Sequence, residues 1–192
     1  MTAPSKAIDA PFTFGRLIRI TALAWLAIVS LDFFLNAGLL ARIYRWDLPG
    51  FLSPIKMFQY IPLGYAAFLL WSILLVWLMK RLSIAGLKRG AVFGLRVGIL
   101  CAAAGFFGQL SIFDLPVWML FTWAVVNTLS FTIGGAVVGA GMASPNLRRL
   151  TLRLVALFLV CLVCGIVLQN IGGNPSARRL PGRIGISWDE ER

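Results

Sequence analysis

The residue with the clearest capacity for chemistry is Asp32, a carboxylic acid inside a long apolar segment. A carboxylate within a membrane-spanning helix is costly, so it usually faces the interior of a helix bundle or a wet cavity. Asn36 follows four residues later and therefore lies on the same face of a helix. Two roles stay open for Asp32: a structural hydrogen bond that fixes helix packing, and a coupling site for an ion or a proton.

Further polar residues fall at comparable depth in other apolar segments. With a rise of about 1.5 Å per residue, Asp32 and Asn127 lie roughly 12 Å and 15 Å from the outer ends of their helices. We expect a polar intramembrane cluster in the outer half of the bundle, formed by Asp32, Asn36, Gln109, Thr122 and Asn127. Arg96 lies near the opposite end of its helix and is too distant in depth to be the counter-ion of Asp32.

No catalytic constellation is present. The sequence has no histidine, which excludes imidazole bases, His-ligated haem and His-containing metal sites. Cys161 and Cys164 form a CxxC pattern, but an apolar setting leaves such thiols inert. We expect no metal and no motif-bound cofactor, whereas binding of a pigment, a quinone or a lipid stays open because apolar clefts need no motif. An enzyme would have to use Asp32 or the loop at 41–57, and nothing else in the sequence argues for one.

Five apolar segments must position these residues. The chain has 192 residues, of which 59% are hydrophobic and 13% charged, whereas about a quarter of an average soluble protein is charged. A helix needs about 20 apolar residues to cross a bilayer. The sequence predicts an all-α, polytopic transmembrane helical bundle within 17–172, with spans at about 17–40, 58–79, 91–113, 117–142 and 154–171.

Small residues recur at intervals of four in the third and fourth segments. Gly94, Gly98 and Ala102 form one stripe, and Gly135 and Gly139 form a GxxxG pattern. Small residues let helix backbones approach closely in membranes. Because a short turn joins the two segments, they are antiparallel neighbours, and we expect the stripes to serve helix packing.

The basic residues indicate orientation. The net charge is +11, but Lys and Arg cluster at the ends of apolar segments, so we expect the lipid bilayer and not nucleic acid as a partner. The larger share of these bases falls on the side of the N-terminus, which favours an N-in, C-out orientation. Residues 1–16 are then cytoplasmic, 41–57 form an outer interfacial loop, and 173–192 form a charged tail. A fifth segment that does not cross fully would place the tail inside instead.

One stretch resembles known proteins. The sequence LDFFLNAGLL at 31–40, followed by IPLGY at 61–65, resembles a group of small bacterial inner-membrane proteins of uncharacterised function. The resemblance covers roughly the first four segments. It implies a multi-pass location in the bacterial plasma membrane and offers no activity.

Two functions follow from these patterns. The small-residue stripes and the lack of catalytic residues favour a structural or accessory subunit that packs against other membrane protein subunits or self-associates. The alternative is a transporter or channel that uses Asp32 as an ion- or proton-coupling site. Flux measurements on an Asp32→Asn variant separate the two.

Overall fold

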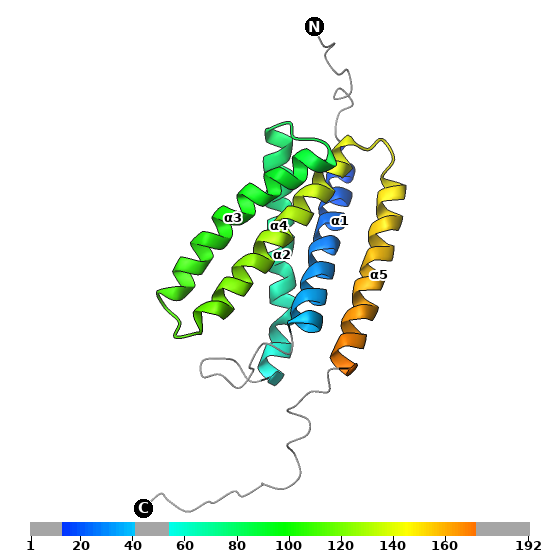
Figure 1. Cartoon of the computed structure of the whole chain (residues 1–192). Coiled ribbons are helices and arrows are strands. Elements are labelled where there is room, and N and C mark those ends of the chain that lie inside the picture. The colour runs from blue at the N-terminus through cyan, green and yellow to red at the C-terminus, as the bar shows by residue number, and fades with distance from the viewer. Residues whose placement is uncertain (1–12, 41–53, 172–192) are drawn as a thin grey trace, which may run out of the picture.

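The computed structural model describes residues 13–40 and 54–171, and these residues form a helical bundle (Figure 1). The helices are α1 (Phe14–Asp32), α2 (Pro54–Arg81), α3 (Leu87–Leu110), α4 (Val117–Ala143) and α5 (Leu147–Ile171), and a π-helical segment, η1 (Phe33–Leu39), continues α1. Five helices in the described ranges are long and apolar enough to cross a membrane. The predicted all-α bundle is thereby confirmed for these ranges.

Several helices extend beyond the predicted bounds. α1 begins at Phe14 and α2 at Pro54, and proline is favoured in the first helical turn. α3 begins at Leu87 and ends at Leu110, so both of its ends come earlier in the chain than those of the predicted segment 91–113. α5 begins at Leu147 rather than at 154, so its 25 residues make it comparable to the other spans and not short. The helices can include Lys and Arg near their ends, because the aliphatic part of these side chains lies along apolar surface while the charged group reaches polar surroundings.

Three predicted segments fall mainly outside the described residues. The described ranges leave out 1–12 of the predicted N-terminal segment, 41–53 of the predicted loop and 172–192, which contains the predicted tail. The remainder of the predicted loop, 54–57, is the first turn of α2. The predicted loop is therefore too long at its C-terminal end, because Pro54 starts a helix there.

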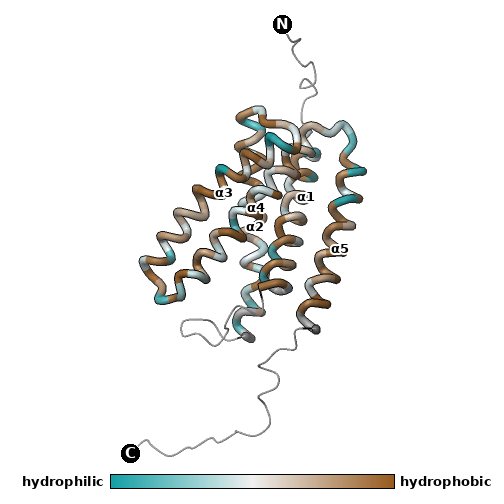
Figure 2. Tube along the Cα trace, viewed as in Figure 1, coloured by the Kyte–Doolittle hydropathy of each residue, from teal (hydrophilic) through white to brown (hydrophobic). Residues whose placement is uncertain are grey.

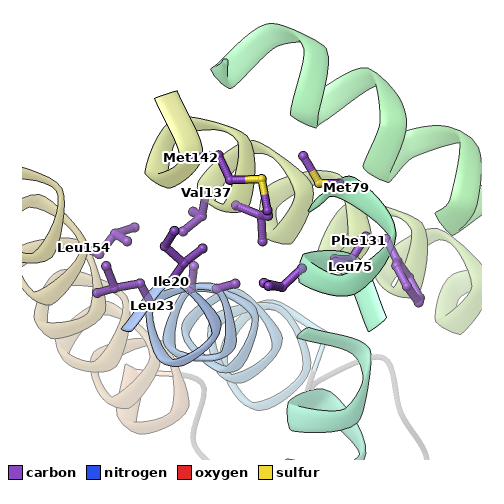
Figure 3. Close-up of a cluster of buried hydrophobic side chains, with 12 residues drawn as sticks. Ile20, Leu23, Leu75, Met79, Phe131, Val137, Met142 and Leu154 are labelled. Atoms are coloured by element: carbon purple, nitrogen blue, oxygen red, sulfur yellow. The ribbon is translucent and has the colours of Figure 1, made fainter. Parts of the chain in front are cut away.

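α1 lies at the centre of the bundle. It contacts α2, α4 and α5, whereas α3 packs mainly on α4 at the edge (Figure 1). Trp71 of α2 stacks on Phe131 of α4 with ring centroids 4.7 Å apart. The buried core drawn in Figure 3 consists of Ile20, Leu23, Ala24, Ala27, Leu75, Val76, Met79, Phe131, Val137, Val138, Met142 and Leu154. Side chains from α1, α2, α4 and α5 thus hold the bundle together.

The small-residue stripes lie between α3 and α4. A Cβ added to Gly94 would lie 3.2 Å from Cα of Gly135, and a Cβ added to Gly139 would lie 3.0 Å from Cα of Gly90. Gly98 is buried in the same stripe. These distances leave no room for larger side chains, so the two backbones pack directly as an antiparallel hairpin.

The close approach of α3 and α4 ends at Ala102. Ala102 is 5% exposed, whereas a Cβ added to Gly105 or to Gly108 would meet no atom within 4 Å. Toward the turn at Asp114 the two helices therefore separate. An apolar groove of about 340 Å³ opens between them.

Charge divides the bundle into two ends. One end, called the basic end below, carries Arg16, Arg19, Lys80, Arg81, Lys88, Arg89, Arg148 and Arg149. Figure 2 shows hydrophilic residues there and apolar residues along the helices. The other end carries the turn at Asp114. Among the described residues Asp32 and Asp114 are the only carboxylates, and neither lies at the basic end.

Candidate functional site

Asp32 is the last residue of α1 and is half-buried. Its Oδ1 accepts a hydrogen bond from Nδ2 of Asn36 at 2.7 Å. The spacing of four residues puts both side chains on one face of the chain, and the structure brings them into contact. One oxygen of the carboxyl group therefore has its hydrogen-bond partner in the same segment of the chain.

The backbone changes from an α-helix to a π-helix directly after Asp32. η1 runs from Phe33 to Leu39, and the N–H of Leu40 donates to the carbonyl of Leu35, five residues earlier, at 2.7 Å. π-helical turns are rare and recur at functional sites. Asp32 therefore lies at the junction of two helical geometries, a feature that no residue pattern predicts.

α5 approaches η1 at two glycines. A Cβ added to Gly38 would lie 3.1 Å from Cα of Gly165, and a Cβ added to Gly165 would lie 2.8 Å from Cε1 of Phe33. Small residues allow this approach, as they do between α3 and α4. The pair was not predicted, because neither glycine belongs to a glycine repeat at spacing four.

Tyr65 of α2 lies near Asp32. The backbone carbonyl of Tyr65 also accepts a hydrogen bond from Nε1 of Trp25 at 2.9 Å. Trp25 and Asp32 are about two helical turns apart and share a face of α1. Asp32 therefore lies on the face of α1 that meets α2. Tyr65 is not among the predicted cluster residues, although a phenol inside an apolar segment is a polar group that the sequence shows.

The other three predicted cluster residues lie on the α3–α4 hairpin. Asn127 is half-buried on α4, and within the described ranges no hydrogen bond joins it to Asp32. The hydroxyl of Thr122 donates to the carbonyl of Trp118 in its own helix at 2.8 Å. Gln109 belongs to the last turn of α3, the helix at the edge of the bundle (Figure 1). The structure thus brings together only Asp32 and Asn36, and the larger cluster stays a prediction.

No family model, curated protein or solved structure matches this chain. The resemblance to small bacterial inner-membrane proteins therefore stays a prediction. What the site offers chemically is a carboxyl group, an amide and a phenol, on Asp32, Asn36 and Tyr65. These groups accept and donate hydrogen bonds, and the carboxyl group can hold a proton.

Seven hydroxyl groups in the spans are satisfied within their own helices. Each donates to the carbonyl four residues earlier, at 2.5 to 3.0 Å: Thr21, Ser30, Ser72, Thr122, Thr128, Thr132 and Thr151. Ser130 differs, because it is fully buried and its Oγ has no partner among the described residues. Hydroxyl hydrogens committed to the backbone in this way are not available to a polar path between helices.

Arg16 connects two helices at the basic end. Its Nη2 donates to the carbonyl of Gly141 at 3.1 Å and to that of Ser144. Carbonyls at the C-terminal end of a helix lack partners within the helix and favour cations. The role of Arg16 was not predictable from the sequence, because a basic residue near a span end is ordinary in membrane proteins and indicates only orientation.

Proposed function

We propose that this protein is a structural or accessory subunit of a membrane assembly. The observation that carries the proposal is that hydroxyl groups in the spans form hydrogen bonds within their own helices and do not join neighbouring helices. Seven hydroxyls bond within their own helices, while α3 and α4 meet through glycines. This bundle presents helix surfaces to its surroundings, and packing of such surfaces drives association in lipid.

The outer side of α3 is the surface proposed for a partner. α3 joins the bundle mainly through α4. Away from its glycine stripe Leu100 is 72% exposed, and Phe107, which also borders the apolar groove toward α4, is 67% exposed. The partner is another membrane protein or a second copy of the chain. Large apolar side chains of this kind pack against a neighbouring helix without the desolvation penalty that polar groups carry.

Site-specific photocrosslinking in membranes tests this proposal. A photoreactive amino acid at Leu100 or Phe107 is expected to give a discrete crosslinked protein, identified by mass spectrometry. The matched control is Met119, which is fully buried on α4 and should crosslink only within the chain. Adducts with lipid alone at both positions of α3 would contradict the accessory role.

A transporter or channel that uses Asp32 is the second candidate. It is favoured by the intramembrane carboxyl group next to a π-helix, with Asn36 in contact and Tyr65 nearby. Wild type and Asp32→Asn are reconstituted in liposomes, and proton and ion fluxes are compared. Flux that the substitution abolishes supports this candidate. Flux equal to that of protein-free liposomes rules it out.

We propose that the location is the bacterial plasma membrane, with the N-terminus inside. α1 starts at the basic end, and the positive-inside rule assigns such an end to the cytoplasm. The resemblance of 31–40 and 61–65 supports the bacterial assignment. Fluorescent protein fusions at either terminus, viewed in a bacterial host, test both statements.

A further inference from the structure

A groove lies at the basic end, between the turn that follows α2 and the first turns of α3. It has a volume of about 460 Å³. Its lining consists of Leu82, Ser83, Ile84, Lys88, Arg89, Val92, Phe93 and Arg96. The residues from α3 recur at intervals of three and four and so share one face of the helix. That face is opposite to the glycine stripe that packs on α4.

The groove carries positive charge without a described counter-charge. Lys88, Arg89 and Arg96 are exposed, and none of them makes a hydrogen bond or ion pair with another described residue. The two described carboxylates, Asp32 and Asp114, lie away from the basic end. The N-terminus of α3 adds its partial positive charge at the same place. An anion is the chemical complement of this groove.

The depth of the groove distinguishes a lipid from a soluble anion. Lys88 and Arg96 are eight residues apart, about 12 Å along the helix axis. Apolar side chains, Val92 and Phe93, lie between them. Because α3 has the length and hydropathy of a membrane span, the groove runs from its polar end into its apolar part. The long side chain of Arg96 can extend toward the head groups while its stem stays in the apolar layer.

We propose that this groove binds one anionic phospholipid. The phosphate lies against Lys88, Arg89 and Arg96, and an acyl chain lies along Val92 and Phe93. Basic pockets between membrane helices bind anionic head groups by this combination of charge and apolar contact. The proposal does not rest on the proposed accessory role, because it uses the groove residues alone, and Leu100 and Phe107, which carry that role, lie farther along α3 and do not line the groove.

Nanodiscs of phosphatidylcholine with and without phosphatidylglycerol supply the test. The groove variant is Lys88→Gln/Arg89→Gln/Arg96→Gln. The matched control is Arg148→Gln/Arg149→Gln/Arg153→Gln, which removes three cations from the start of α5 at the same end. Native mass spectrometry measures the phosphatidylglycerol that each protein retains. Each cation near the surface contributes about fivefold in affinity, so the groove variant is expected to bind on the order of a hundredfold more weakly, with the control close to wild type.

Three outcomes would overturn the proposal. They are equal retention of phosphatidylglycerol by the two triple variants, equal retention of phosphatidylcholine and phosphatidylglycerol by wild type, and displacement of the lipid by inorganic phosphate alone. Size-exclusion profile and helicity check that each variant folds. Should the groove variant not fold, the single substitutions Arg96→Gln and Arg153→Gln repeat the comparison, with weaker retention expected only for Arg96→Gln.

Discussion

The backbone N–H of Gly86 donates a hydrogen bond to the carbonyl oxygen of Gly139 at 2.8 Å. The bond joins the turn between α2 and α3 to the last turns of α4. Gly86 has a φ of 98°, in the left-handed region that glycine adopts without steric cost. The turn is thus fixed to α4 at the point where the glycine-lined contact of the α3–α4 hairpin begins.

Gly94→Ala is expected to separate α3 from α4. The added Cβ would lie 3.0 Å from the carbonyl carbon of Phe131, and a backbone atom cannot move aside as a side chain can. Overpacking of this kind costs about 1–3 kcal/mol. Gly105→Ala is the control, because its Cβ meets no atom within 4 Å, and it should be neutral or stabilise the helix by up to about 1 kcal/mol. Thermal unfolding in detergent measures both, and equal melting temperatures would show that the stripe does not determine packing.

Gly38→Leu is expected to weaken the contact of η1 with α5. The new side chain would start 3.1 Å from Cα of Gly165, so the unfolding free energy should fall by about 1–3 kcal/mol. Gly64→Leu places the same side chain where a Cβ meets nothing within 4 Å and should melt close to wild type. A loss of stability in Gly64→Leu as large as in Gly38→Leu would rule out the specific contact.

Arg16→Gln is expected to destabilise the basic end. The variant lacks the charged group that bonds to the carbonyls of Gly141 and Ser144, and a hydrogen bond to a charged group contributes about 1.5–3 kcal/mol. Arg19→Gln removes an equal charge from an exposed position one turn away. The melting temperature should fall clearly for Arg16→Gln and little for Arg19→Gln. The reverse order would refute the link between α1 and α4.

Asp32→Asn is expected to fold as wild type does. The substituted amide keeps an oxygen that accepts the hydrogen bond from Asn36. Asp32→Ala removes that acceptor and should cost about 0.5–2 kcal/mol, the range of hydrogen bonds within membranes. Melting curves in detergent compare the two. An Asp32→Asn variant as unstable as Asp32→Ala would mean that the negative charge itself holds the structure.

Periodicity and hydropathy in the sequence predict much of the fold. The five apolar segments and the spacing of Gly94, Gly98, Gly135 and Gly139 are visible without a structure, because span length and close backbone approach depend on local composition. The positions of the helix ends are harder to predict from the sequence. Proline and clustered bases usually indicate the end of an apolar span, yet Pro54 and the bases at the start of α5 lie in the first turns of helices, since a first turn tolerates proline and a span end tolerates charge.

The candidate site was predictable only in part. The contact between Asp32 and Asn36 is predicted by their spacing of four residues in one helix, so it does not depend on how other helices pack. The neighbours of Tyr65, Gly165 and Arg16 lie on other helices. Because each of these contacts uses a single residue of its segment, no periodic pattern predicts it. Their partners are set by which helices are neighbours and by the rotation of each helix, which side-chain packing over the whole bundle determines.

In the proposed topology the apolar helices cross a membrane, so the basic end and the Asp114 turn lie on opposite sides of it. Single cysteines at Leu82 and at Asp114, in a chain whose Cys101, Cys161 and Cys164 are replaced by alanine, test it with a membrane-impermeant maleimide. Intact cells should be labelled at position 114, and position 82 should react only after permeabilisation. Labelling of both positions from the same side would contradict the account.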